Sequence, residues 1–238
     1  MTRIYMLLFV APMLALLGCA SPPVMPTLDS VSPATGSPKP IYLLSVSLRN
    51  SLRPEYQLRL SYLGIYQHVA PNSARKFAVE IDQQSTLPSA ADQSSRYLIR
   101  LQLDPGKYTL HSLISFGSVP FFKGFFATPL HADIDVSAPG VFYLGHVQAI
   151  VRERVGSEFT AGPPMFFPLL GQALTQSATG ATTGTFDIVF SDNFSEDEPL
   201  LRSRFPALKD ARITKSILPP FDRPRAQKWW DENNLMLW

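Results

Sequence analysis

Apolar and polar residues alternate with a period of two along much of this 238-residue chain. In the segment 56–62, for example, Leu58 and Leu60 are separated by Arg59. The same alternation occurs in three further segments, at residues 42–48, 76–82 and 96–103. Successive side chains of a β-strand point to opposite faces, so this pattern predicts strands with one buried face and one face in water.

A turn signal follows the last of these segments. Asp104, Pro105 and Gly106 lie between two alternating runs; proline fixes the φ angle of a turn, and glycine tolerates a positive φ. We therefore predict a β-hairpin whose second strand covers residues 107–110. Several short strands without a long amphipathic helix predict an antiparallel β-sandwich over residues 41–222. Its further strands are expected at 132–136, 141–151 and 185–190.

One short C-terminal helix is predicted after residue 190. Ser195 and Glu198 have the spacing of a capping box, and acidic residues in a first turn stabilise the positive end of the helix dipole. Pro199 is acceptable in the first turn of such a helix. Leu201 and Phe205 would then pack on the sheet, and the proline that follows ends the helix.

The chain begins like an exported protein. Arg3 precedes an uncharged apolar run at residues 4–17, which is too short as a helix to cross a bilayer core of about 30 Å. A positive start, an apolar centre and small residues behind it are typical of a secretory signal peptide, here residues 1–18. Cys19 follows directly and is the one cysteine of the chain. A single cysteine excludes a disulfide framework within the chain and a multi-cysteine metal site.

The sequence Leu16-Leu17-Gly18-Cys19 resembles the lipobox of bacterial prolipoproteins, in which a leucine and two small or apolar residues precede the cysteine. The resemblance covers residues 1–21 and implies that Cys19 becomes an acylated N-terminus. Two or more acyl chains anchor a protein stably, so the lipid bilayer is an expected partner. In that family an Asp after the cysteine retains the protein at the inner membrane. Ala20 stands there in this chain, which implies the outer membrane and a domain that faces the periplasm.

Residues 19–40 are predicted to form a lipidated tether. Six of them are prolines, mixed with Ser, Thr and Gly. This composition favours an extended, polyproline-like chain over a packed core. At about 3.1 Å per residue, twenty residues reach roughly 60 Å. We therefore expect the tether to hold the folded domain away from the membrane.

Residues 103–110 are similar to a hairpin that is common in transthyretin-like and carboxypeptidase-regulatory-like β-sandwiches. The segment from Asp133 to Gly145 is similar to the next strand pair of envelope lipoproteins of that kind. The resemblance implies a binding or structural domain with no inherited active site.

Motifs for catalysis are absent from the sequence, which has no G-x-S-x-G, no H-E-x-x-H and no phosphate-binding loop. His131, Asp133 and Asp135 would share one strand face and form the best candidate metal cluster, although a solvated sheet face gives the same pattern. A periplasmic Ser–His–Asp hydrolase or metal-dependent enzyme, with His146 as a further candidate residue, stays open as an alternative. We expect no enzyme, no cofactor and no metal. With 21 Lys+Arg against 19 Asp+Glu, the chain also lacks the basic excess of nucleic-acid-binding proteins.

Three segments hold an excess of aromatic residues that the strand pattern does not explain. They are a run of paired phenylalanines, the start of a Gly/Thr/Ala-rich loop at 162–184, and a Trp-rich tail at 223–238. Aromatic and Met side chains are enriched in protein interfaces, so we predict that they bind another envelope protein. Core packing, contact with the membrane interface and a cleft for an apolar ligand or lipid are the alternatives. The candidate partner-binding residues are Phe121, Phe122, Phe125, Phe126, Met165, Phe166, Phe167, Trp229, Trp230 and Trp238.

Overall fold

The computed structural model describes residues 24–25, 39–71, 73–83, 86–88, 94–119, 122–163 and 170–233. The predicted signal peptide, Cys19 and most of the predicted tether lie outside these residues. Two residues of the tether segment, Val24–Met25, form the short strand β1 and pair with the folded domain. The chain is therefore attached to the domain soon after the predicted lipidation site.

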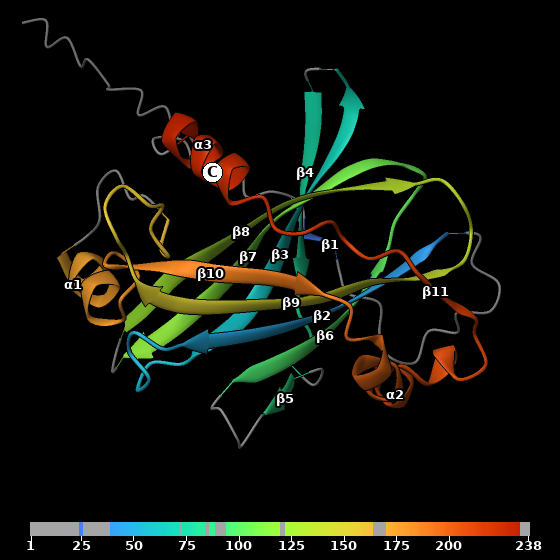
Figure 1. The fold of residues 1–238 in the computed structure, drawn as a ribbon, viewed down its shortest axis with the longest axis horizontal. Coiled ribbons are helices and arrows are strands. Elements are labelled where there is room, and N and C mark those ends of the chain that lie inside the picture. Colours follow the sequence, from blue (N-terminus) through green and yellow to red (C-terminus); the bar gives the residue numbers. More distant parts are fainter. Residues whose placement is uncertain are drawn as a thin grey trace, which may run out of the picture.

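The strands form two sheets, which we call sheet A and sheet B (Figure 1). Sheet A has the order β1 (Val24–Met25), β4 (Ser73–Glu80), β3 (Leu58–Ala70), β7 (Gly106–Val119) and β8 (Phe122–Val136). Sheet B has the order β10 (Gly184–Ser191), β9 (Val141–Glu153), β2 (Ile41–Asn50), β6 (Ser95–Gln102) and β5 (Thr86–Pro88), and β11 (Ile213–Lys215) also pairs with β9. Three pairings are parallel, namely β1 with β4, β2 with β9 and β11 with β9, and the others are antiparallel.

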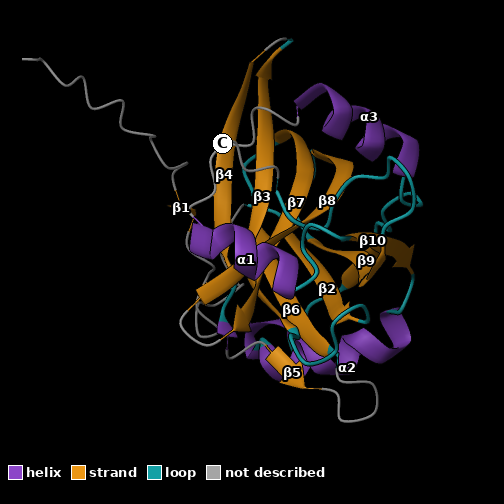
Figure 2. Ribbon diagram, turned by 90° about the vertical axis from the view of Figure 1, so that its left-hand side faces the viewer, coloured by secondary structure: helices purple, strands orange, loops and turns teal. Residues whose placement is uncertain are grey.

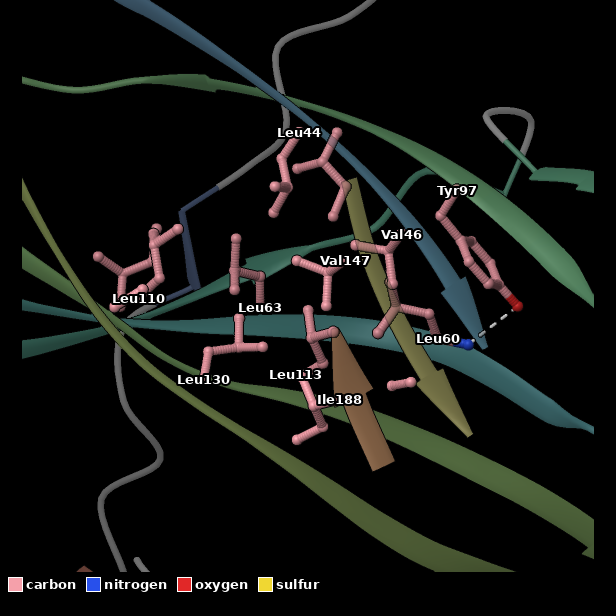
Figure 3. Packing of buried hydrophobic residues seen from close by; sticks show 14 of the residues in the cluster. Leu44, Val46, Leu60, Leu63, Tyr97, Leu110, Leu113, Leu130, Val147 and Ile188 are labelled. Carbon is pink, nitrogen blue, oxygen red and sulfur yellow. Dashed lines mark hydrogen bonds between the residues drawn. The ribbon is translucent and has the colours of Figure 1, made fainter. Parts of the chain in front are cut away.

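The two sheets enclose the main hydrophobic core, which confirms the predicted mainly-β class. Figure 3 shows inward side chains of both sheets in this core, such as Val46 of β2 and Leu63 of β3. Tyr97 of β6 lies in the same core, where its hydroxyl accepts the Leu60 N–H at 3.1 Å and donates to the Leu58 carbonyl at 3.3 Å. This phenol joins sheet B to sheet A and satisfies polar atoms that would be costly to bury unpaired.

The predicted hairpin at residues 104–106 is wrong. Strand β6 before this turn pairs with β2 and β5 in sheet B, whereas β7 after it pairs with β3 and β8 in sheet A. The turn therefore carries the chain across the core from one sheet to the other, and Tyr108 closes it by donating to the Asp104 carbonyl at 2.9 Å. Alternation is the same on both sides of such a crossing, so the pattern does not distinguish it from a hairpin. Strands β8 and β9, expected as a pair, also lie in different sheets.

Three α-helices lie among the described residues: α1 (Leu170–Ala178), α2 (Phe194–Arg204) and α3 (Arg223–Asn233). Figure 2 shows them on the outside of the sheets. Helix α2 is the predicted one, but it begins at Phe194, with Asn193 and not Ser195 at the N-cap position, and Pro199 is its sixth residue. The predicted capping box is wrong: the helix already starts at Phe194, whose ring lies 5.2 Å from that of Tyr143, and the Asn193 side chain makes no capping hydrogen bond. Helices α1 and α3 occupy segments predicted as a loop and as a tail.

Helix α3 has a clear start. The Asp222 carboxylate accepts the Arg225 N–H at 2.9 Å, and Pro224 stands in the first turn, where a missing N–H costs nothing. Among the described residues, no helix combines the length and the hydropathy needed to span a bilayer.

Candidate functional site

Helix α3 lies on the outside of the sheets (Figure 2) and contacts β8. An ion pair between Arg225 and Asp133 joins the two elements. Both terminal nitrogens of Arg225 contact the Asp133 carboxylate, at 2.9 and 3.1 Å. Asp133 also accepts the Thr109 hydroxyl at 2.6 Å, and the Thr109 oxygen lies 2.8 Å from Nε2 of His68. Because the Thr109 proton is directed to Asp133, its oxygen accepts from the histidine. Charge-assisted bonds in two-pronged geometry fix the orientation of the helix.

Next to this ion pair lies a group of four rings, which we call the α3 cluster: Tyr66, His111, His131 and Trp229. The Trp229 ring is 4.7 Å from that of His111 and 5.0 Å from that of His131, and the two histidine rings are 4.8 Å apart. Tyr66 stacks on His111 at 4.2 Å. Three strands of sheet A and helix α3 thus meet in one aromatic contact.

Both histidines of the α3 cluster are neutral at neutral pH. Burial, with smaller effects of His131 and Lys76, lowers the pKa of His111 to about 3. Burial and the charge of Arg225 lower the pKa of His131 to about 4, against an opposing effect of Asp133. The Nδ1 of His111 lies 3.0 Å from the Ser112 hydroxyl, while Nε2 of both rings is buried with no hydrogen-bond partner among the described residues.

The three side chains of the candidate metal cluster, His131, Asp133 and Asp135, do not come together around one point. His131 is buried beneath Trp229, where β8 departs from regular pairing and the histidine has a φ of 47°. Asp133 is occupied by Arg225 and Thr109, and Asp135 is exposed. Within the described part of the chain, no group of three or more His, Cys, Asp or Glu side chains could hold a metal ion.

His146 belongs to a second polar group, between sheet B and helix α2. Its Nδ1 lies 2.6 Å from Oγ of Ser45, and that hydroxyl donates to the Asp197 carboxylate. Tyr143 donates to the same carboxylate oxygen at 2.5 Å, and Arg96 lies 3.0 Å from the other oxygen. We call these five residues the α2 network. Around it pack outward apolar residues of sheet B, one leucine of α2 and two residues that follow α2: Ile41, Leu43, Leu98, Leu201, Phe205 and Leu208.

The α2 network brings a serine, a histidine and an aspartate together, but in the wrong order for a hydrolase. In a catalytic triad the histidine lies between the nucleophile and the carboxylate. Here Ser45 lies in the middle: its proton goes to Asp197, so it accepts from Nδ1–H of His146. Ser45 and Asp197 are fully buried, so this arrangement presents no nucleophile to a substrate.

Charge and burial explain the titration of the α2 network. Burial and the nearby Arg96 cation lower the pKa of His146 to about 4, although Asp197 acts in the opposite direction. Burial and the hydrogen bond to Asp197 raise the pKa of Tyr143. At neutral pH the histidine is therefore neutral and the tyrosine keeps the proton that it donates.

The predicted aromatic residues fall into three groups. Phe126 is fully buried and packs on Phe186 in the core at 6.4 Å, so it is a core residue and not part of a docking surface. Phe125 is half-buried beside Phe116, with ring centroids 4.8 Å apart. Trp229 and Trp230 are half-buried on α3, and Trp230 contacts the core. Phe122 is the first residue of β8. The predicted site residues that lie outside the described part of the chain are Cys19, Phe121, Met165, Phe166, Phe167 and Trp238.

No protein-family model matches the chain, and no curated protein or solved structure is detectably similar to it. The fold and the two side-chain groups define a mainly-β protein of two sheets with helices fastened to their outer faces. Three histidines, His111, His131 and His146, and two carboxylates, Asp133 and Asp197, lie in the contacts between these helices and the sheets. Aromatic side chains of α3 and β8 reach the surface.

Proposed function

We propose that this chain is a membrane-anchored envelope lipoprotein whose β domain is a non-catalytic binding or structural component. One observation supports the non-catalytic role of the β domain. The groups able to transfer protons, such as Ser45 and His131, are buried in contacts between helix and sheet, whereas Trp229 and Phe125 remain partly open to a partner. The lipobox at residues 16–19 supports the membrane anchor and the expected periplasmic side of the outer membrane.

The anchor is tested by the substitution Cys19→Ser. Each buried CH₂ of an acyl chain contributes about 0.8 kcal/mol to membrane binding, so losing the chains is expected to lower the membrane-bound fraction by about 100-fold or more. Cell fractionation and labelling with radioactive palmitate measure this effect. Ser21→Ala, two residues away, is the matched control and should keep both label and membrane fraction. Normal processing and unchanged membrane binding of the Cys19→Ser protein would contradict the proposal.

The binding role is tested on α3. A photo-crosslinking amino acid in place of Lys228, whose side chain is 76% exposed beside Trp229, is expected to capture a defined envelope protein in intact cells. The same group in place of exposed Lys209 next to α2 is the control and should not capture it. Trp229→Ala is expected to lower the yield about tenfold, the usual effect of truncating an aromatic anchor. Equal capture from both positions would count against this surface.

A further inference from the structure

The hairpin formed by β3 and β4 extends past the neighbouring strands of sheet A, and Figures 1 and 2 both show its tip clear of the rest of the domain. The described residues of the tip, from His68 to Lys76, are all exposed. Val69 is 54% exposed, which is unusual for a large apolar residue of this domain. The tip therefore presents its side chains outside the packed structure.

The tip is positively charged. Between Glu55 and Glu80 the chain contains no acidic residue, while Arg75 and Lys76 lie at the tip. Their charged groups lie over aromatic rings of the same hairpin, Arg75 over Phe77 at 6.0 Å and Lys76 over Tyr66 at 5.3 Å. Within the described part of the chain, neither cation forms a salt bridge.

The acidic groups on the neighbouring strands are matched by cations of their own. Asp133 is held by Arg225, and Asp104 lies 2.8 Å from Lys39. Asp135 stands opposite Lys107 in the pairing of β7 with β8. The two cations of the tip are therefore not neutralised by this end of sheet A.

Strand β1 enters sheet A from the side of this tip. Val24 pairs with Ala78 and Met25 with Val79 in parallel register. Since β4 runs away from the tip, a parallel β1 is entered from the tip side. Cys19 is five residues before Val24 and can reach at most about 18 Å from it. Ser73 at the tip is five residues before Ala78, a distance of about 17 Å along the strand.

We propose that the tip of the β3–β4 hairpin docks, through Arg75 and Lys76, on anionic lipid head groups of the bilayer that holds Cys19. This inference rests on the proposed lipid anchor. The short link from Cys19 to β1 keeps the tip near the bilayer surface, where each basic residue is attracted to anionic lipid. The domain then lies close to the membrane, with this end of sheet A toward it. The distance between the domain and the bilayer is therefore not set by the prolines that follow Met25.

The docking is tested with the mature lipidated protein in vesicles of phosphatidylcholine, with or without phosphatidylglycerol. The thiol of Cys19 is used by its lipid, so Ser73→Cys provides one free thiol for an environment-sensitive fluorophore. Its emission is expected to shift to the blue on vesicles with phosphatidylglycerol and not on pure phosphatidylcholine. Glu55→Cys, beyond the opposite end of the 13-residue strand β3, is the control and should not respond.

Replacing both tip cations, Arg75→Gln with Lys76→Gln, is expected to reduce the ratio of docked to undocked protein about 30-fold at low salt. The matched control replaces two exposed cations near α2, Lys209→Gln with Arg212→Gln, and should leave the signal unchanged. Flotation of the vesicles separates the two proposals. Protein that does not float contradicts the lipid anchor. Protein that floats while the Ser73 probe stays in water, or responds equally on both vesicles, contradicts the docking alone.

Discussion

Acidification is expected to unfold this protein between about pH 6 and pH 4, well before its carboxylates are fully protonated. The cause is the set of three buried histidines, two in the α3 cluster and one in the α2 network. Their pKa values in the folded protein are about 3 for His111 and about 4 for both His131 and His146. In the unfolded chain each histidine titrates near its ordinary pKa of 6.5.

The sign of the effect follows from proton binding. Between the unfolded and folded pKa values, the unfolded chain binds protons that the folded protein does not, so the free energy of unfolding falls as the pH falls. One pKa unit corresponds to about 1.4 kcal/mol, which makes a shift from 6.5 to about 4 worth roughly 3 kcal/mol for His131 and again for His146. Together they are comparable to the whole stability of a typical domain, about 5–15 kcal/mol.

Urea unfolding at a series of pH values, followed by circular dichroism, measures this dependence. His131→Gln removes one titrating group and is expected to make stability depend less steeply on pH by about one proton. His68→Gln, at an exposed position of the same sheet, is the control and should keep the steep dependence. A free energy of unfolding that stays constant from pH 7 to pH 4 would show that these histidines are not buried in their neutral form.

Local sequence patterns predicted the strands but not their partners. The alternation at 42–48 and 96–103 corresponds to β2 and β6, because side-chain direction along a strand depends on adjacent residues. The expected water-facing side of these two strands is wrong, because α2 and the residues after it cover that side: Leu43 and Leu98 are buried in one cluster with Leu201. Whether two successive strands share a sheet is decided by contacts far apart in sequence, such as the parallel pairing of β2 with β9. The turn at 104–106 therefore has the sequence pattern of a hairpin although it joins two sheets.

The contacts between the helices and the sheets could not be predicted from local sequence patterns, for the same reason. Ser45 and Asp197 are 152 positions apart, and Asp133 and Arg225 are 92 apart, so no local spacing marks either pair. The start of α3 did carry a signal, since Asp222 followed by Pro224 is typical of a helix N-terminus. The pairing of β1 with β4 carried none, because two residues in a proline-rich segment show no alternation.

Asp197→Ala is expected to lower the free energy of unfolding by about 3–5 kcal/mol, the usual cost of removing one partner of a buried ionic group. The carboxylate accepts hydrogen bonds from Ser45 and Tyr143 and lies 3.0 Å from Arg96. Its removal leaves two hydroxyls without their acceptor and leaves the largely buried Arg96 with only the more distant Glu196 as a carboxylate partner among the described residues, at a site with little access to water. The packing of α2 on sheet B is expected to weaken with it.

Glu196→Ala is the matched control for this substitution. Glu196 is the preceding residue of the same helix and also faces Arg96, at 3.6 Å, but its side chain is 67% exposed. Exposed ion pairs contribute about 0–1 kcal/mol, so this variant should remain nearly as stable as the original protein. Asp197→Asn keeps the size and one acceptor oxygen, and its loss of stability is expected to lie between those of the two alanine variants.

Thermal or urea unfolding of the three variants distinguishes a structural from a chemical role of the α2 network. A large loss for Asp197→Ala with a small loss for Glu196→Ala means that the carboxylate holds α2 on the sheet. A loss below about 1 kcal/mol for Asp197→Ala would mean that the buried network adds little to stability. Ser45, His146 and Asp197 would then be unexplained by packing, and the enzyme alternative would gain weight over a binding or structural domain.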